Sequence, residues 1–127
     1  MRLIIAGSRS ITDKRFVEEA IEASGFKPTV VFCGGARGVD SIGEDWARRN
    51  GIQVEHYLPE YDRAGKGSPL LRNKLMAENA DALLAIWDGK STGTMHMLRC
   101  ALDKGLEVRL AMPHLIALWK PHTKEIA

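Results

Sequence analysis

The sequence has little of several features that mark specialised protein classes. Its two cysteines, Cys33 and Cys100, lie far apart in 127 residues, so we expect neither a disulfide framework nor a CxxC metal site. No apolar run approaches the length of a membrane span, and the run at residues 3–6 is too short for a signal peptide. The net charge of +2, with scattered lysines and arginines, argues against a protein that coats DNA or a membrane surface. We therefore expect a cytoplasmic protein with buried free thiols, no metal and no cofactor.

What the sequence does contain is a regular alternation of short apolar runs and longer amphipathic segments. Unbroken apolar runs separated by helices indicate a parallel sheet buried on both faces. The last run alternates charged and apolar residues, which suits an edge strand. The pattern predicts a three-layer α/β, Rossmann-like domain with a mainly parallel five-stranded sheet. We expect strands at 3–6, 29–33, 52–58, 82–87 and 106–112, in one domain spanning 1–127, with a C-terminal tail (113–127) as a candidate oligomer contact.

In an open parallel sheet, ligands bind beyond the carboxyl ends of the strands, so the loops that follow the strands are the places to search. After the first strand, Gly7 permits a sharp turn, Ser8 can donate a hydrogen bond, and Arg9 offers a planar fork of donors for phosphate or carboxylate. A plain strand-to-helix turn with a solvated arginine is the alternative interpretation.

The loop after the second strand is rich in small residues and opens a helix, reading GGARGVD over residues 34–40. Small residues let a ligand approach the backbone, and free N–H groups at a helix start favour an anion. The alternative is a tight turn that needs glycine for positive φ. Asp40 lies in the first helical turn, where it can cap N–H groups or bond a ribose hydroxyl, and both roles stay open.

A second cluster of glycine and hydroxyl residues follows the fourth strand, at Ser91, Gly93 and Thr94. It lacks the spacing of a P-loop, which disfavours Mg-dependent NTP hydrolysis. Trp87, at the end of the strand, can either stack on a base or pack in the core.

Arg72 and Asn73 lie in the first turn of the third expected helix, at the same end of the sheet. An arginine near a helix N-terminus is electrostatically unfavourable unless an anion compensates, which supports a ligand role for Arg72; a solvent-facing arginine is the alternative. The predicted ligand-binding residues are Gly7, Ser8, Arg9, Gly34, Gly35, Ala36, Arg37, Gly38, Asp40, Arg72, Asn73, Trp87, Ser91, Gly93 and Thr94.

Four motifs occur in order along the chain: Gly-Ser-Arg, Gly-Gly-Ala-x-Gly-x-Asp, Arg-Asn-x-x-Met and Gly-Thr. Over about residues 3–111 this combination resembles the SLOG superfamily, in particular its small YspA-type (YAcAr-like) branch. The resemblance implies a Rossmann-like domain that binds nucleotides or nucleotide-derived signals. Relatives include the LOG phosphoribohydrolases, the DNA-processing protein DprA and signal-sensing domains of bacterial defence systems. Because such relatives often self-associate, we expect a homo-oligomer.

The sequence departs from the LOG pattern, Pro-Gly-Gly-x-Gly-Thr-x-x-Glu, at its glutamate, which contributes to cleaving an N-glycosidic bond. Alignment on Gly93-Thr94 puts Met97 in that place, and a thioether neither transfers a proton nor stabilises a ribosyl cation as a carboxylate does. Arg72 matches the family's helix-three arginine. If the chain cleaves such a bond, another carboxylate must act, and the candidate catalytic residues are Arg72, Asp40 and Asp88.

Three hypotheses follow for function. The leading one is a nucleotide-binding domain that senses or sequesters a nucleoside phosphate or an ADP-ribose-like compound. The alternative is a phosphoribohydrolase that releases the base from a nucleoside 5′-monophosphate. Single-stranded DNA binding comes third, because the near-neutral charge and the aromatic content of 6% supply neither a basic groove nor stacking platforms. The expected partners are a small-molecule nucleotide and further copies of the chain, with no membrane and no nucleic acid.

Overall fold

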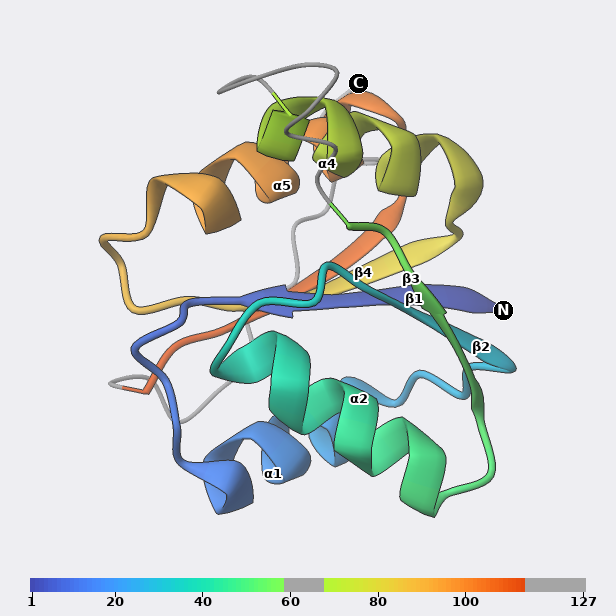
Figure 1. The fold of residues 1–127 in the computed structure, drawn as a ribbon, viewed down its shortest axis with the longest axis vertical. Helices are drawn as coiled ribbons and strands as arrows, with labels where there is room; N and C mark the ends of the chain where they lie inside the picture. The colour runs from blue at the N-terminus through green and yellow to red at the C-terminus, as the bar shows by residue number, and fades with distance from the viewer. Residues whose placement is uncertain (59–67, 114–127) are drawn as a thin grey trace.

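The computed structural model describes residues 1–58 and 68–113, which form five parallel strands and four helices (Figure 1). The strands are β1 (Arg2–Gly7), β2 (Val30–Cys33), β3 (Gln53–His56), β4 (Ala82–Ile86) and β5 (Glu107–Ala111). The helices are α1 (Lys14–Ser24), α2 (Val39–Arg49), α4 (Ser68–Asn79) and α5 (Thr92–Asp103). The expected element order is confirmed. The third strand is shorter than predicted, although Tyr57 N–H still donates to the Cys33 carbonyl just beyond it.

Local signals set the helix ends. The Asp13 carboxylate accepts a hydrogen bond from the Phe16 N–H and caps α1, and Gly25 ends that helix with a φ of 75°. Ser91 caps α5 in the same way by accepting from Thr94 N–H.

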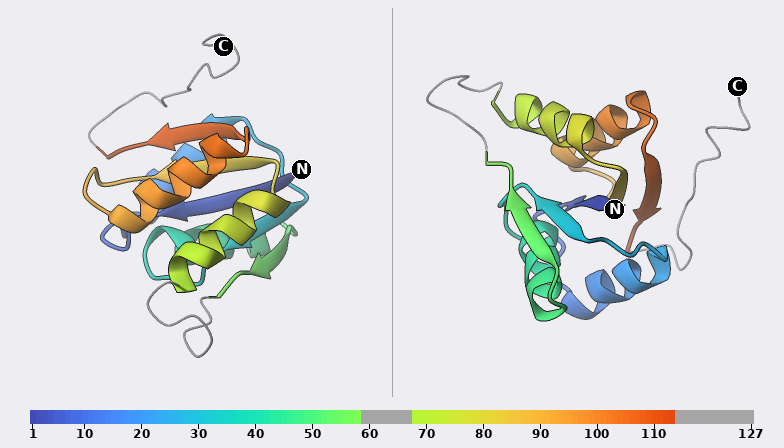
Figure 2. Two further views of the ribbon diagram at one scale, coloured as in Figure 1. Left: turned by 90° about the horizontal axis from the view of Figure 1, so that it is seen from above. Right: turned by 90° about the vertical axis from the view of Figure 1, so that its right-hand side faces the viewer.

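The sheet has the strand order β3-β2-β1-β4-β5, and every pair is parallel. From β1 the chain first winds outward to β2 and β3 and then returns to the other side of β1 for β4 and β5. Helices α1 and α2 cover one face of the sheet and α4 and α5 the other, which makes three layers (Figures 1 and 2). The Rossmann-like prediction is confirmed, and β5 lies at an edge as expected. The point where the winding reverses, between β1 and β4, is where ligands bind in such sheets.

Alternate residues of each strand face the two helical layers, so the protein has two apolar cores. Leu3, Ile5 and Leu84 pack with α1 and α2, whereas Ile4 and Leu83 pack with α4 and α5. These five side chains are fully buried. The sheet is therefore a rigid platform for the loops at its carboxyl edge.

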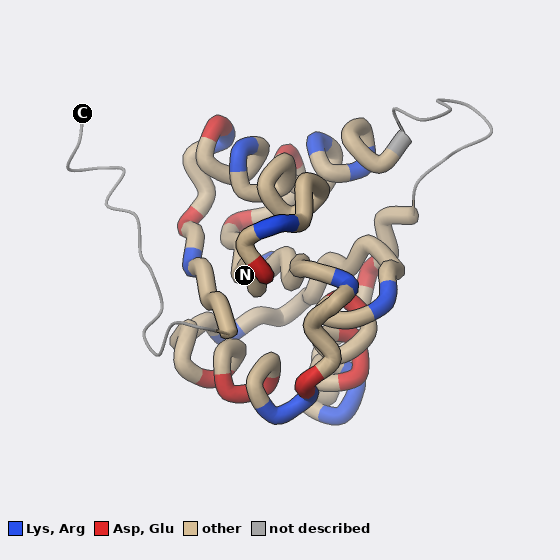
Figure 3. Tube along the Cα trace, turned by 90° about the vertical axis from the view of Figure 1, so that its left-hand side faces the viewer, with Lys and Arg blue, Asp and Glu red and all other residues tan. Residues whose placement is uncertain are grey.

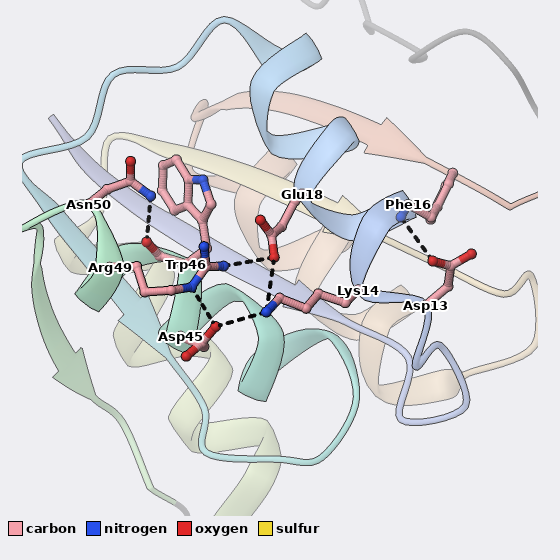
Figure 4. Close-up of polar contacts among 8 residues, drawn as sticks. All are labelled: Asp13, Lys14, Phe16, Glu18, Asp45, Trp46, Arg49 and Asn50. Atoms are coloured by element: carbon pink, nitrogen blue, oxygen red, sulfur yellow. Dashed lines mark hydrogen bonds and ion pairs between the residues drawn. The ribbon is translucent and has the colours of Figure 1, made fainter.

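An ion-pair network joins α1 to α2 on the surface (Figure 4). Lys14 and Arg49 each contact both Glu18 and Asp45, with Arg49 2.7 Å from Glu18 and 2.8 Å from Asp45. Such exposed pairs are screened by solvent and contribute little to stability individually. The network fixes the α1–α2 layer, and α2 begins at the glycine-rich loop.

Both cysteines are buried and unpaired, as expected. Burial raises the pKa of the Cys33 thiol to about 12. Within residues 1–58 and 68–113, no helix has the length and apolar character needed to cross a bilayer. The tail predicted as an oligomer contact falls outside the described residues from position 114 onward.

Candidate functional site

The carboxyl ends of β1, β2 and β4 bring the three predicted loops to one edge of the sheet. Gly7 at the end of β1 pairs with Ile86 at the end of β4, so the loops that follow them leave side by side. A cavity of about 100 Å³ lies there. Nine predicted ligand-binding residues line it: Gly7, Arg9, Ala36, Asp40, Arg72, Asn73, Ser91, Gly93 and Thr94.

The loop after β1 is pinned to its neighbours. A side chain on Gly7 would collide with the Ile86 carbonyl and with Val39, so only glycine fits. Ser8 is buried; its N–H donates to the Ile86 carbonyl, and its Oγ accepts from Asp88 N–H at 3.0 Å. The structure therefore uses Ser8 to join two loops, a role that the sequence does not reveal.

Arg9 follows Ser8 and lines the cavity with an exposed side chain. In the described part of the chain, no carboxylate or hydrogen-bond acceptor contacts its guanidinium. Arg9 is thus an available cation beside the cavity.

The glycine-rich loop is a turn that needs glycine at two positions, and its approach to a ligand stays a prediction. Gly35 and Gly38 have φ of 78° and 74°, which favours glycine, and Gly38 also packs against the carbonyl oxygens of Ser8 and Arg9. Gly34 instead makes room for other side chains, because a Cβ there would touch the Arg72 guanidinium and lie 2.9 Å from Asp40 Oδ2.

Arg37 points away from this cavity. Its exposed side chain lines a separate surface groove of about 470 Å³ with Ser41 from the first turn of α2 and Arg48 from its last turn. Ala36 lines both the groove and the cavity, so the two hollows adjoin.

Asp40 is the buried carboxyl of the site, with an exposed fraction of 6%. Its Oδ2 accepts from Ala36 N–H at 3.3 Å. Burial raises the pKa of Asp40 above its ordinary value, opposed by the Ala36 N–H, the nearby charge of Arg72 and the N–H groups of Gly7 and Gly34. A carboxyl in a cavity with a raised pKa is suited to proton transfer.

Arg72 projects from the first turns of α4 and is held against the protein. Its Nη1 donates to the Gly34 carbonyl at 2.9 Å and to the Tyr57 carbonyl at 3.3 Å, and its Nε donates to Asn73 Oδ1 at 2.9 Å. The guanidinium is therefore fixed at the cavity wall between α4 and the loop after β2.

Asp88 shapes the loop before α5. Its Oδ1 accepts from the N–H groups of Lys90 and Ser91, both at 2.8 Å, and its Oδ2 accepts from Ser10 Oγ at 2.7 Å. These donors hold the pKa of the Asp88 carboxyl well below its ordinary value. Asp88 does not line the cavity, so of the two carboxylates predicted for catalysis, only Asp40 lies where a ligand would bind.

The N-terminus of α5 presents free amides. Ser91 Oγ accepts from Thr94 N–H and the Ser91 carbonyl accepts from Met95 N–H, both at 3.3 Å. Within the described chain, the first two helical amides, of Thr92 and Gly93, have no such acceptor. A Cβ on Gly93 would meet nothing within 4 Å, so this end of the helix is open. It suits an anion.

Trp87 braces this loop, because its half-buried indole Nε1 donates to the Ser91 carbonyl at 2.9 Å. Met97 is buried and lines the cavity, so a thioether stands where the LOG pattern has a carboxylate.

His96 also contacts the site, because its Nδ1 lies 3.0 Å from Asn73 Nδ2. The contact joins two helices across 23 positions, and no local pattern signals it.

Comparison with known proteins places these features in a wider context. Residues 1–63 match the model of the YspA, cpYpsA-related SLOG family. The chain is 35% identical over 116 residues to the Gene 61 protein of Mycobacterium phage D29, which covers 84% of this chain and 93% of the phage protein.

The fold is similar to that of DNA processing protein A (DprA) from Streptococcus pneumoniae, with a TM-score of 0.69 and 19% sequence identity. The match covers 91% of this chain, which spans half the length of the DprA chain. At this identity the likeness concerns the fold alone.

Proposed function

The chain belongs to the YspA, cpYpsA-related SLOG family, and from this premise we propose that it binds a nucleotide or nucleotide-derived molecule by its phosphate group. The ligand class is a nucleoside phosphate or an ADP-ribose-like compound, which the protein senses or sequesters. The observation that carries the proposal is the cavity of about 100 Å³ shared by Arg9, Arg72 and the open start of α5. Amide donors, a helix N-terminus and planar guanidinium groups together favour a phosphate oxyanion.

The dimensions of the site support a phosphate rather than a whole nucleotide inside the cavity. The ribose and base would extend outward, and the adjoining groove of about 470 Å³ beside Arg37 and Ser41 offers room for them. Asp40 lines the cavity and accepts a hydrogen bond from Ala36, the residue that both hollows share, so its carboxyl is an acceptor for a ribose hydroxyl.

Calorimetry with nucleoside monophosphates, nucleoside diphosphates and ADP-ribose tests the proposal. We expect saturable binding that Arg9→Gln weakens about tenfold or more, because a charge-assisted hydrogen bond is lost. Arg15→Gln is the matched control, since Arg15 is an exposed arginine of α1 that pairs with Glu19 away from the cavity. A ligand at about 100 times its Kd stabilises the fold by about 2.7 kcal/mol. Absence of binding at about millimolar concentration, or equal losses in the two variants, would refute the proposal.

A second function is supported by one observation, the carboxyl of Asp40 with its raised pKa beside Arg72 in the cavity. It is the hydrolysis of a nucleoside 5′-monophosphate to a free base and ribose 5-phosphate. Chromatography after incubation tests it. We expect any base release to vanish in Asp40→Asn; release that persists in this variant, or that is absent from the wild type, would exclude this activity for Asp40.

A DNA control belongs in the same experiments, because the fold is similar to that of a DNA processing protein. Figure 3 shows basic and acidic positions interspersed over the helices of both layers. This distribution disfavours a backbone-tracking groove. If single-stranded DNA gives a gel shift at low salt and Arg9→Gln abolishes that shift, the site binds nucleic acid instead.

A further inference from the structure

We infer that His96 is a positioning residue for this site: its neutral imidazole orients the Asn73 carboxamide, and Asn73 in turn holds Arg72 at the cavity. The inference rests on the proposed function for its ligand. Its structural part depends only on a chain of hydrogen bonds from α5 to α4.

The direction of each hydrogen bond in this chain is fixed by chemistry. Arg72 Nε can only donate, so the atom 2.9 Å away must be the oxygen of the Asn73 carboxamide. The amide nitrogen of Asn73 then faces His96, and it donates to Nδ1 at 3.0 Å. A ring nitrogen that accepts carries no proton, so His96 is the neutral tautomer protonated at Nε2.

Asn73 stands between the two anion-binding elements of the site. It is 4% exposed and lines the cavity from α4. Its amide nitrogen also lies 3.5 Å from the Gly93 carbonyl in the first turn of α5. Helices α4 and α5 lie side by side on one face of the sheet (Figure 2). The Asn73 carboxamide thus sets both the orientation of the Arg72 guanidinium and the distance between that guanidinium and the start of α5.

The surroundings of His96 favour the neutral ring. Partial burial lowers the pKa of His96, and the positive charges of Lys74 on α4 and Arg99 on α5 lower it further. The Sγ of Cys100 packs 3.7–3.8 Å from the ring nitrogens. Burial raises the pKa of the Cys100 thiol, and the negative charge of Asp103, further along α5, raises it too. This thiol therefore stays uncharged at neutral pH.

Protonation of His96 would break the chain of hydrogen bonds. Two N–H groups would then point at each other across the gap of 3.0 Å between His96 and Asn73. Rotation of the carboxamide would relieve this conflict only by turning its NH₂ group toward Arg72 Nε. Rotation removes the Asn73 oxygen from Arg72 Nε, and without rotation the repulsion pushes the Asn73 carboxamide away from its place beside Arg72, so the site should hold an anion less well.

Two substitutions separate this role from a general effect on packing. In His96→Asn, the side-chain oxygen takes the place of Nδ1 and accepts a hydrogen bond without titrating. In His96→Leu, a side chain of similar bulk offers no acceptor. Inorganic sulfate is the probe because it stays a dianion from about pH 5 to about pH 8, the range in which histidine titrates.

At about pH 8 we expect His96→Asn to bind sulfate like the wild type and His96→Leu to bind about tenfold more weakly. At about pH 5 the affinity of the wild type should fall relative to that of His96→Asn, toward that of His96→Leu, whereas protonation of Asp40 in the cavity acts on all three proteins alike. Equal affinity of His96→Leu and wild type at the higher pH would overturn the inference. So would a constant ratio of wild type to His96→Asn at both pH values.

If sulfate does not bind, that result counts against the proposed function alone. Nitrogen-15 NMR then tests the positioning role of His96. We expect His96 Nδ1 to be unprotonated at about pH 8, and Arg72 Nε–H to exchange more slowly in wild type and His96→Asn than in His96→Leu. A protonated Nδ1 would overturn the positioning role. If His96→Leu does not fold, equal pH dependence of Arg72 Nε–H exchange in wild type and His96→Asn would overturn it.

Discussion

Replacement of Gly34 by alanine probes how the cavity is assembled. The new Cβ would touch the Arg72 guanidinium and lie 2.9 Å from Asp40 Oδ2, so one of these charged groups must move. Forced rearrangement in a packed site costs about 1–3 kcal/mol. Because Nη1 of Arg72 also donates to the Gly34 carbonyl at 2.9 Å, the same change weakens an anchor of the arginine. We expect Gly34→Ala to lower both the free energy of unfolding and the affinity for phosphate.

A double-mutant cycle with Arg72→Met, measured by urea unfolding, identifies the source of the cost. If the guanidinium is what collides, Gly34→Ala should be milder in the Arg72→Met background by about 1–2 kcal/mol. Gly93→Ala is the control, because its Cβ would meet nothing within 4 Å. It should leave stability unchanged or raise it by up to about 1 kcal/mol. Additive effects of the Gly34 and Arg72 substitutions would refute this account of the cavity wall.

Three further predictions concern buried charge, loop shape and backbone strain. Asp40→Asn should raise the free energy of unfolding at about pH 7, because burial raises the pKa of Asp40 and so makes its charged form costly in the fold. The gain should fade as the pH falls through the raised folded pKa toward 3.8. Urea unfolding at several pH values measures it, and the absence of any gain would contradict the prediction. Asp88→Asn should lower the free energy of unfolding above about pH 4, since the fold depresses the pKa of Asp88. The difference from wild type should shrink as acid protonates that carboxylate. A pH-independent difference in thermal melts would contradict this prediction. Gly38→Ala should destabilise more than Gly25→Ala in the same melts. Gly25 has the left-handed helical φ and ψ of 75° and 0°, whereas Gly38 has 74° and −125° and also abuts backbone oxygens. Equal losses would contradict this prediction.

The sheet and the convergence of the three loops at one edge of it were predictable because both follow from repetitive, short-range features. Unbroken apolar runs such as Ala82–Ile86 identify buried parallel strands, and parallel strands send their following loops to one edge. That rule alone is enough to bring Arg9, Arg72 and Gly93 to one cavity. The capping roles of Asp13 and Ser91 are equally local.

The division of labour among polar residues was not predictable, because it depends on contacts between distant segments. Ser8 and Asp88 were both predicted to act on a ligand, yet they bond to each other's loops across 80 positions. The roles of Asp40 and Asp88 separate only once burial is known, since one carboxyl is enclosed and the other is surrounded by donors at the surface. Nothing in the local sequence of His96 indicates that it faces Asn73.

The hydrogen bonds that Asp88 accepts from Lys90 and Ser91 have a consequence for the kinetics of recognition. They aim the start of α5 before any ligand arrives, so the conformational entropy of that turn is lost during folding and not during association. An anion that binds as proposed would then meet a site that requires little rearrangement. We expect encounter to be fast and governed by diffusion and charge, with differences in affinity between ligands expressed in their residence times.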